Sequence, residues 1–366
     1  MAGGFVGDAD VMDTWATSSL TPQIAGGWED DPELFALVFP MDLRPQAHDI
    51  IRTWLFSTIV RSELEHGSLP WSDAAISGWV LDPDRKKMSK SKGNVVTPLP
   101  LLDKHGADAV RYWAASGRPG TDTAVDEGQM KVGRRLAIKV LNASRFALGR
   151  IVVADGRVSA PGPEAITAPI DRAMLERLAG VIEESTSAFE AYDYARALER
   201  TEAFFWSFCD DYLELVKVRA YGDAAEPGPA SAQAALALAL SAMLRLLAPI
   251  TPFVTEEVWS WWQAGSIHLA PWPTPAEFGP GLSVGDAGPA PVLEVAAEVL
   301  GQVRRAKTTA KRSMRSEVAV LTVSDSPERI AALLSAQGDL RDAGGVRSLV
   351  TNVAEVPSVE VVLAEG

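Results

Sequence analysis

Hydrophobic positions divide the chain into a mixed first part and a mainly helical remainder. Apolar residues recur at helical spacing between residues 49 and 65, and a strand-like run follows over 75–81. Thr97-Pro98 is typical of a helix start, and the pattern predicts two short helices that reach to about residue 113. We therefore expect an α/β arrangement over roughly the first hundred residues.

From about residue 129 the pattern changes to long amphipathic helices. Apolar residues from Val132 to Ala147 fall on one face, and a second seam runs from Tyr194 to Leu215 in alternating steps of four and three. Such seams are typical of a packed helical bundle. The pattern predicts its further helices at about 170–190, 192–220, 231–248 and 253–264.

The last part of the chain mixes helix and strand again. We expect a helix from residue 291 to about Arg315, a strand at 318–323, a helix after Ser326-Pro327, and strands near 346–353 and 357–363. This order predicts a small α+β domain. Two stretches rich in Gly, Pro and Ala are expected to be linkers, at 155–168 and 265–290. The expected domains are residues 1–95, 96–128, 129–275 and 290–366.

Composition narrows the class of protein. The 366 residues are 47% hydrophobic, which allows a sizeable core, and carry a net charge of −14, which excludes a uniformly cationic surface. A single cysteine, Cys209, excludes an internal disulfide and a multi-cysteine zinc site. The longest strongly apolar stretch, 234–244, is shorter than the about 20 residues that a bilayer span needs. The first twenty residues contain no basic side chain, unlike a targeting signal. We expect a cytoplasmic protein with no membrane partner.

Residues 87–91, with the sequence KMSKS, are the segment most suggestive of chemistry. The pattern places them in a loop between a strand and a helix, with clustered ammonium groups, two hydroxyls and a backbone freed by Gly93. Such groups can stabilise the charge of a departing polyphosphate. An exposed basic loop without a function is the alternative.

This segment matches the KMSKS signature of the class I aminoacyl-tRNA synthetases, and its surroundings resemble the valyl-tRNA synthetase family. The further stretches that resemble this family are residues 10–19, 49–54, 108–111, 139–146 and 247–253. The resemblance runs in order along nearly the whole chain and weakens beyond about residue 290.

The resemblance implies a multidomain fold. It comprises a partial α/β Rossmann-type class I catalytic domain, then an α-helical anticodon-binding bundle, then a small α+β C-terminal domain. The implied activity is that of a valine–tRNA ligase, which activates valine with ATP and transfers it to tRNA-Val. ATP, accompanied by Mg²⁺, is the implied cosubstrate, and the complete protein is expected to be a monomer.

The resemblance also assigns roles near the loop. Lys90 would contact the ATP phosphates while Lys87 and Ser89 would support the loop, so these three are the candidate catalytic residues. Asp49 would bind the adenylate ribose, and His48 lies beside this ATP-binding site by sequence. The position of Asp49 also fits a helix N-cap, and the two roles are compatible.

Three apolar residues are candidates for the valine pocket. Trp15, Ile50 and Trp54 would line it, because rigid apolar walls suit a small branched side chain. Ordinary core packing is the alternative for the two tryptophans. No residue is predicted to bind a metal ion directly.

The chain departs from the family pattern in several places. None of its four histidines forms the HIGH-type motif, and the inserted editing domain is absent. Ala16 and Ala47 stand where the family usually has an aromatic residue and a glycine. We therefore expect a C-terminal portion of a synthetase that is inactive without the N-terminal half, which would be its partner.

A basic cluster near the C-terminus is the candidate tRNA-binding surface. Six of the twelve residues from 304 to 315 are basic and none is acidic: Arg304, Arg305, Lys307, Lys311, Arg312 and Arg315. Spacing of four predicts that Lys307, Lys311 and Arg315 share a helix face, which suits a phosphate backbone. A solvated helix surface is the alternative.

Two other functions stay open from the sequence. One is a related synthetase for isoleucine or leucine, although Thr14-Trp15 and residues 49–51 favour valine. The other is a non-catalytic tRNA-binding module that keeps the helical part and the tail without the chemistry.

Overall fold

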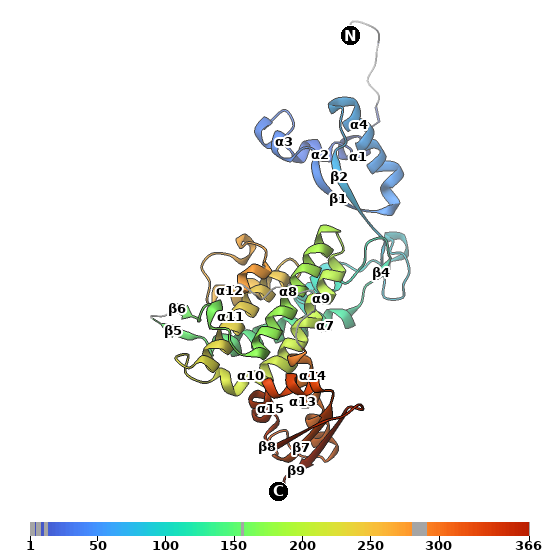
Figure 1. Cartoon of the computed structure of the whole chain (residues 1–366). Coiled ribbons are helices and arrows are strands. Elements are labelled where there is room, and N and C mark those ends of the chain that lie inside the picture. The colour runs from blue at the N-terminus through green and yellow to red at the C-terminus, as the bar shows by residue number, and fades with distance from the viewer. Residues whose placement is uncertain (1–3, 5–8, 11–13, 155–156, 280–290, 366) are drawn as a thin grey trace. The chain divides into compact units, whose positions relative to one another are not determined.

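The computed structural model describes residues 4, 9–10, 14–154, 157–279 and 291–365 (Figure 1). Residues 11–13 of the family-like stretch at 10–19, and residues 280–290 of the second expected linker, lie outside this described part. The chain divides into two compact units. Unit 1 comprises residues 1–98 and 117–126, and unit 2 comprises residues 99–116 and 127–366. The segment expected at 96–128 is thus distributed between both units.

Unit 1 contains a crossover between two parallel strands. Strand β1 (Met41–Ala47) pairs with β2 (Trp71–Ser77), in a register from Met41↔Trp71 to Ala47↔Ser77. The connection begins with short turns η1 (His48–Ile50) and η2 (Ile51–Leu55) and continues as α4 (Phe56–His66). A helical crossover is what parallel strands require, and the helix predicted over 49–65 is confirmed. Three short helices precede β1: α1 (Thr14–Ser18), α2 (Thr21–Ala25) and α3 (Pro32–Val38).

The strand predicted over 75–81 is divided at Gly78. After β2 ends at Ser77, β3 (Val80–Leu81) pairs in parallel with β4 (Thr123–Ala124) in a separate two-stranded sheet. At Gly78 the backbone of Thr121 and Asp122 passes so close that a side chain there would collide with it. This close approach explains the break and places residues 121–125 beside Gly78 and β3.

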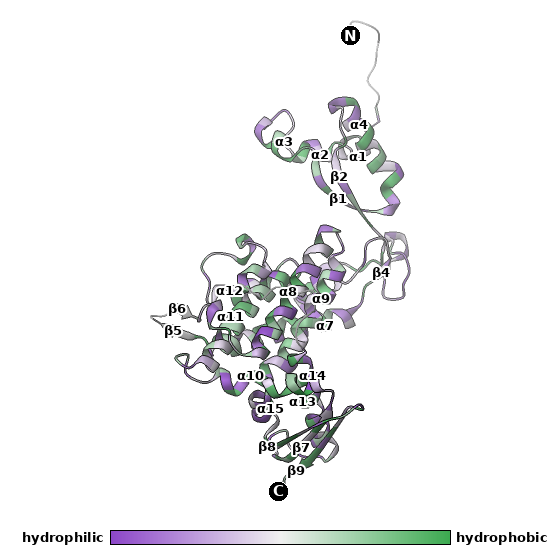
Figure 2. Ribbon diagram, in the orientation of Figure 1, coloured by the Kyte–Doolittle hydropathy of each residue, from purple (hydrophilic) through white to green (hydrophobic). Residues whose placement is uncertain are grey.

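Unit 2 is built around a helical bundle. The long helices predicted from the sequence are confirmed, with the 192–220 helix interrupted by the π-helical turn η5 (Phe208–Tyr212). Figure 2 shows both hydrophobic and hydrophilic residues on the helices of this bundle. The helices are α5 (Pro98–His105), α6 (Ala107–Ala115), α7 (Glu127–Leu148), α8 (Pro169–Glu190), α9 (Tyr194–Ser207), α10 (Leu213–Ala220), α11 (Pro227–Leu247) and α12 (Pro252–Ser260). Strand β5 (Val152–Ala154) precedes the first expected linker and pairs antiparallel with β6 (Arg157–Ser159), which lies within it.

Helix α11 is the central apolar helix of this bundle. Within the described part of the chain it alone is long and apolar enough to cross a membrane, and 89% of its most apolar window is buried in the protein. It extends beyond the apolar stretch that the sequence marks at 234–244. Packing inside the bundle therefore accounts for its composition.

Polar contacts attach α6 to the start of α12. The Asp108 carboxylate accepts hydrogen bonds from the backbone N–H groups of Phe253 (3.1 Å) and Val254 (2.8 Å), in the first turn of α12. Arg111, one turn later, donates to the carbonyls of Ile250 (3.1 Å) and Pro249 (2.8 Å). The family-like stretches at 108–111 and 247–253 thus bind one another.

The C-terminal part forms a three-stranded sheet with helices. Strand β7 (Val318–Asp325) lies between β8 (Val346–Val353), to which it is parallel, and β9 (Ser358–Leu363), to which it is antiparallel. Helices α14 (Pro327–Ser335) and α15 (Gln337–Gly344) connect β7 to β8. The predicted order of helices and strands is confirmed. Helix α13 (Val292–Thr309), however, ends six residues before Arg315, and Lys311 has a left-handed backbone conformation with φ of 52°.

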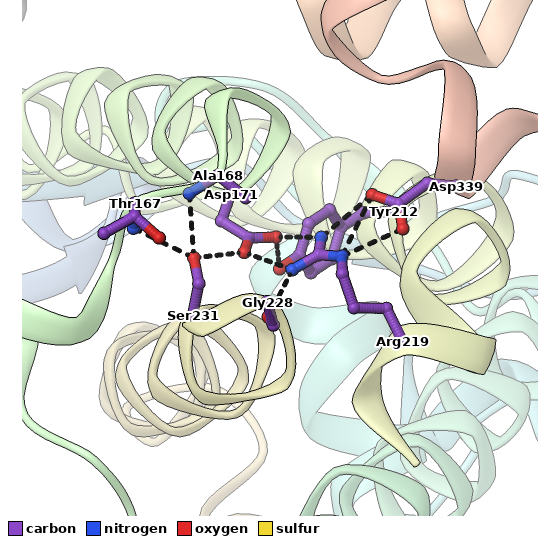
Figure 3. A network of polar contacts seen from close by, with 8 residues as sticks. All are labelled: Thr167, Ala168, Asp171, Tyr212, Arg219, Gly228, Ser231 and Asp339. Carbon is purple, nitrogen blue, oxygen red and sulfur yellow. Dashed lines mark hydrogen bonds and ion pairs between the residues drawn. The ribbon is translucent and has the colours of Figure 1, made fainter. Parts of the chain in front are cut away.

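A buried network joins this sheet-bearing part to the bundle (Figure 3). Arg219 on α10 donates to both carboxylate oxygens of Asp171 on α8, at 2.8 Å each, and to both of Asp339 on α15, at 2.9–3.2 Å. The hydroxyls of Tyr212 (2.8 Å) and Ser231 (2.6 Å) also donate to Asp171. Burial would lower the pKa of Arg219, but its hydrogen bonds to the two carboxylates raise that pKa above its ordinary value.

Candidate functional site

The KMSKS segment begins just after a tight turn, where the chain runs back alongside β3. Leu81 and Lys87 form an antiparallel bridge across the turn, and the N–H of Asp82 donates to the carbonyl of Lys86 at 2.9 Å. The N–H of Arg85 donates back to the Asp82 carbonyl at 2.9 Å, and Arg85 has a φ of 63°. Pro83 within the turn suits this geometry. The Asp82–Arg85 turn therefore fixes where residues 86–94 begin.

Two side chains hold the rest of this loop. The Asp82 carboxylate accepts from the N–H of Lys86 through Oδ1 and from Nδ2 of Asn94 through Oδ2, both at 2.7 Å. Asn94 also donates to the carbonyl of Lys87 at 3.2 Å and accepts from the N–H of Ser89 at 3.0 Å. The backbone bond from Lys86, followed by the bond from Asn94, lowers the pKa of Asp82.

The three predicted catalytic residues lie on this loop in different settings. The ammonium of Lys87 lies 3.9 Å from the centre of the Trp79 ring and 3.9 Å from Oδ2 of Asp49. The Ser89 hydroxyl is within hydrogen-bond distance of the Ser91 hydroxyl, at 3.2 Å. Lys90 is exposed and begins the short 3₁₀ turn η3 (Lys90–Lys92), which ends at Gly93 with φ of 68°. Lys90 is therefore accessible to a ligand from solvent.

The predicted nucleotide-binding residues lie close to Lys87. His48 and Asp49 follow β1 in the turn η1. The His48 ring lies 4.7 Å from the Trp79 ring, and its Nδ1 is 3.3 Å from the carbonyl of Ser77. Trp79 thus contacts both the first residue of the signature and His48. Lys87 and His48 thus share this ring as a neighbour, and Asp49 lies beside Lys87.

The three residues predicted to line a valine pocket differ in exposure. Trp54 is 3% exposed, stacks on Trp71 with ring centres 5.8 Å apart, and has the Arg44 guanidinium 3.8 Å above its ring. Its Nε1 donates to the carbonyl of Ser18 at 2.6 Å, which holds α1 and its residue Trp15 beside η2. Trp15 is 41% exposed and Ile50 is half-buried. Trp54 therefore packs as a core residue, and the pocket stays a prediction.

The structure corrects the arrangement expected for the basic cluster. Lys307, Lys311 and Arg315 do not share a helix face, because α13 ends at Thr309. Lys307 is 2% exposed, and its ammonium donates to the carbonyls of Gly344 (2.7 Å) and Met314 (3.0 Å). Burial lowers the pKa of Lys307. Lys307 is therefore an interior residue that ties the end of α13 to the segment after it.

The other members of the cluster lie at the surface. Arg304 donates to the carbonyl of Asp210 at 2.8 Å and Arg312 to that of Ala364 at 3.1 Å. Arg305, on α13, lines a cavity of about 450 Å³ against β9. Lys311 and Arg315 are exposed in the segment between α13 and β7. The exposed cations thus lie on the last turns of α13 and the loop that follows.

Comparison with known proteins identifies both parts of the chain. A family model described as "tRNA synthetases class I (I, L, M and V)" matches residues 1–126, and one described as "Anticodon-binding domain of tRNA ligase" matches residues 171–322. The valine–tRNA ligase of Thermobifida fusca is 63% identical over 98% of the chain, and that of Salinispora tropica is 58% identical over 97%. Over nearly its whole length, the chain is similar to part of these valine–tRNA ligases. The resemblance noted in the sequence is therefore confirmed.

The match to valine–tRNA ligases covers only part of their length. The chain spans 40% of the Thermobifida fusca protein and 42% of the Salinispora tropica protein. The features confirmed are a class I synthetase catalytic fragment and an anticodon-binding domain, in a helix-rich fold with some sheet.

Solved structures of related synthetases share the fold. The ternary complex of Agrobacterium radiobacter agnB2 LeuRS-tRNA-LeuAMS superposes on 95% of this chain and 42% of that chain, with a TM-score of 0.60 and 18% identity. Mycobacterium tuberculosis methionyl-tRNA synthetase with methionyl-adenylate covers 68% of this chain and 49% of that chain, with a TM-score of 0.54 and 25% identity. At 18% identity, the likeness to the LeuRS complex concerns the fold alone.

Three residues at the KMSKS loop were missed as site candidates in the sequence. Asp82, Asn94 and Trp79 flank the signature and contact its backbone or its first lysine. Asp82 is recognisable as the first residue of an Asp-Pro-Asp turn, and Asn94 follows Gly93. The sequence gives no indication, however, that these two side chains bind one another across twelve residues.

Proposed function

We propose that this chain carries the ATP-phosphate-binding loop and the anticodon-binding part of a valine–tRNA ligase. The complete enzyme would activate valine with ATP and transfer it to tRNA-Val. The observation that carries this proposal is the high identity to valine–tRNA ligases along 98% of the chain, with the KMSKS loop intact.

The proposed roles of the loop residues follow from charge and exposure. Lys90 would bind the ATP phosphates, because its ammonium is exposed on the loop, and Lys87 and Ser89 would support it. Asp49 would accept hydrogen bonds from the ribose, with His48 beside it. Mg²⁺ would arrive as the complex with the ATP phosphates, whose oxygens are its preferred ligands.

Valine recognition is proposed for the first part of unit 1. Trp15, Ile50 and Trp54 come from α1, η1 and η2, and the hydrogen bond between Trp54 and Ser18 supports a shared location for two of them. An apolar pocket of this kind discriminates by size and shape.

tRNA contact is proposed for the exposed basic residues near the C-terminus. Arg304, Arg305, Lys311, Arg312 and Arg315 would neutralise phosphates, while Lys307 would hold the segment in place. The long-range attraction of such a cluster suits an RNA backbone although the whole chain is acidic.

We also propose the finer layout that the sequence suggests. Residues 1–95 would form the second half of the catalytic domain and 96–128 the connecting segment. Residues 129–275 would form the anticodon-binding domain and 290–366 the small α+β domain. The complete enzyme would act in the cytoplasm as a monomer, and its remaining portion would be the partner of this chain.

Valine-dependent exchange between ATP and pyrophosphate tests the function. We compare this chain alone with a chimera in which it replaces the matching segment of the Thermobifida fusca enzyme. The chain alone should show little exchange and the chimera should be active. Lys90→Ala in the chimera should slow exchange about a hundredfold, the usual effect of losing one charge-stabilising donor.

The matched control is Lys86→Ala. Lys86 is on the same loop, but its bond to Asp82 is made by its backbone N–H, and its exposed ammonium lies 3.6 Å from the carboxylate of the exposed Asp84. This variant should keep the activity of the chimera. An inactive unmodified chimera would contradict the proposed function, and robust exchange by the chain alone would contradict its dependence on a partner.

A further inference from the structure

The side chain of Asn94 uses every hydrogen-bonding group that it has on the signature loop. Its Nδ2 donates to Asp82 at 2.7 Å and to the Lys87 carbonyl at 3.2 Å, and its Oδ1 accepts from the Ser89 N–H at 3.0 Å. An amide offers two donors and one acceptor atom, so this pattern fixes its orientation. Asn94 therefore clamps the two peptide groups on either side of Met88.

Asp82 provides the fixed end of this clamp. It is 6% exposed and follows directly on β3. One of its carboxylate oxygens holds the Lys86 N–H and the other holds Asn94. Hydrogen bonds to a carboxylate are stronger than those between neutral groups, so the pair ties the loop firmly to the strand.

Met88, between the two clamped peptides, adds a contact of its own. Its sulfur lies 3.2 Å from the backbone nitrogen of Val96, two residues beyond Asn94. The entry and the exit of the loop are thus joined from both sides. Lys90 remains exposed at the start of η3, immediately after the clamped Ser89.

We propose that Asp82 and Asn94 form a brace that positions Lys90 for the ATP phosphates. This inference rests on the proposed function and adds two positioning residues outside the five-residue signature. The brace holds the backbone from Lys86 to Ser89, so it sets the direction in which the following residue leaves. A displacement of a catalytic group by about 1 Å can lower the rate about a hundredfold. Loss of the brace should therefore reduce catalysis even though the ammonium of Lys90 is still present.

The first experiment measures the brace in the full chain without requiring activity. Trypsin can cut after Arg85, Lys86, Lys87, Lys90 and Lys92, so the rate of cleavage within 85–92 reports how tightly the loop is held. Asn94→Ala and Asp82→Asn should each raise this rate at least fivefold, with an unchanged melting temperature for unit 2. Asp84→Asn is the matched control. It removes one negative charge, as Asp82→Asn does, but from an exposed side chain two residues further along the chain.

The second experiment measures positioning in the chimera. Asn94→Ala and Asp82→Asn should lower kcat for ATP–pyrophosphate exchange at least tenfold, while KM for valine changes less than threefold. Asn94→Asp should be more harmful than Asn94→Ala. The Asn94 amide now donates to the Asp82 carboxylate at 2.7 Å, and the substitution would put a second carboxylate against the first. Combining Asn94→Asp with Asp82→Asn restores a donor opposite an acceptor and should recover most of the activity.

The outcomes separate this inference from the proposed function. Unchanged cleavage in Asn94→Ala and Asp82→Asn would overturn the brace, whatever the chimera does. Faster cleavage with unchanged kcat, or a swapped pair that recovers nothing, would overturn the positioning role. An inactive unmodified chimera would refute the proposed function and the positioning role with it, whereas the cleavage rates would still decide whether the brace exists.

Discussion

Arg219 joins two buried carboxylates that would repel each other without it. Asp171 is fully buried and Asp339 is 8% exposed. The guanidinium matches both with paired hydrogen bonds, which its planar fork allows and an ammonium does not. At the residue scale, this side chain connects α8 and α10 of the bundle to α15 of the C-terminal part.

Arg219→Met should therefore destabilise unit 2 strongly. It keeps much of the side-chain volume but leaves two unpaired buried carboxylates, and breaking a buried pair costs about 3–5 kcal/mol. Urea unfolding followed by circular dichroism measures the effect. Arg200→Met is the control, because Arg200 and Glu184 form a half-exposed pair at 3.1 Å that should contribute less than about 1 kcal/mol. Equal effects of the two substitutions would refute the argument.

Lys307 shows which residue-level features the sequence could not predict. Its spacing marks it as part of a cationic helix face, because lysines are almost never fully buried. Its two carbonyl partners are Met314, beyond the end of the helix, and Gly344, 37 residues away. By contrast, the exposure of Lys90 follows from local sequence, since Lys90 begins the short turn η3, which Gly93 ends.

At the scale of elements, the signature loop owes its shape to a carboxylate, so its order depends on pH in a defined direction. Hydrogen bonds lower the pKa of Asp82 below its ordinary value of 3.8. A lowered acid pKa in the folded protein means that the contribution is fully present above the ordinary value and is lost as pH falls through the lower one.

Amide hydrogen exchange at Lys86 and Ser89 should therefore show constant protection from pH 8 to pH 5. Protection is measured after correction for the intrinsic exchange rate, and it should decline only below about pH 4, where Asp82 begins to bind a proton. In Asp82→Asn the protection should be weaker and should no longer respond to this titration. Loss of protection between pH 7 and pH 5 in the unmodified chain would contradict the role of Asp82.

The segment after α13 makes a separate prediction about RNA. On the proposed tRNA-binding role, replacing Lys311, Arg312 and Arg315 together by alanine should weaken binding of tRNA-Val. The dependence of log affinity on log salt should become less steep by about one unit for each phosphate that is no longer neutralised. Filter binding across a salt series measures both quantities, with Arg200→Ala as a control that should change neither. An unaltered slope would remove these residues from the proposed tRNA-binding surface.

The order of helices and strands was predictable because it depends on local periodicity. The long helices α7, α8 and α11 were predicted within a few residues, since their apolar faces repeat over several turns. The failures lie where distant chain segments decide the geometry. The strand over 75–81 breaks because residues 121–122 pass beside Gly78. Helix α13 ends before the basic segment that follows it, and the carbonyl of Met314 in that segment accepts a hydrogen bond from Lys307.

At the scale of the whole molecule, the two units are packed very differently. The continuous hydrophobic core lies in unit 2, from Tyr112 to Val346. In the described part of unit 1 the buried apolar side chains other than prolines are Trp54, Trp71, Leu81 and Val125. Large apolar residues of α4 are instead exposed, Leu64 to 82% and Phe56 to 61%. Among the described strands, β1 and β2 pair only with each other, so both retain a free edge.

Unequal packing predicts that the chain unfolds in two steps. Unit 1 should melt first, because its small core buries less apolar surface to offset the entropy of the unfolded chain, and unit 2 should melt at a distinctly higher temperature. Calorimetry resolves the two transitions, and hydrogen exchange assigns each to its unit. Leu178→Ala, at a fully buried position of the bundle, should lower only the upper transition, whereas Leu81→Ala should lower only the lower one. A single transition that both substitutions shift would show that the units fold as one. In the chimera the lower transition should rise, because we expect the Thermobifida fusca portion to cover the strand edges and the exposed apolar residues of α4.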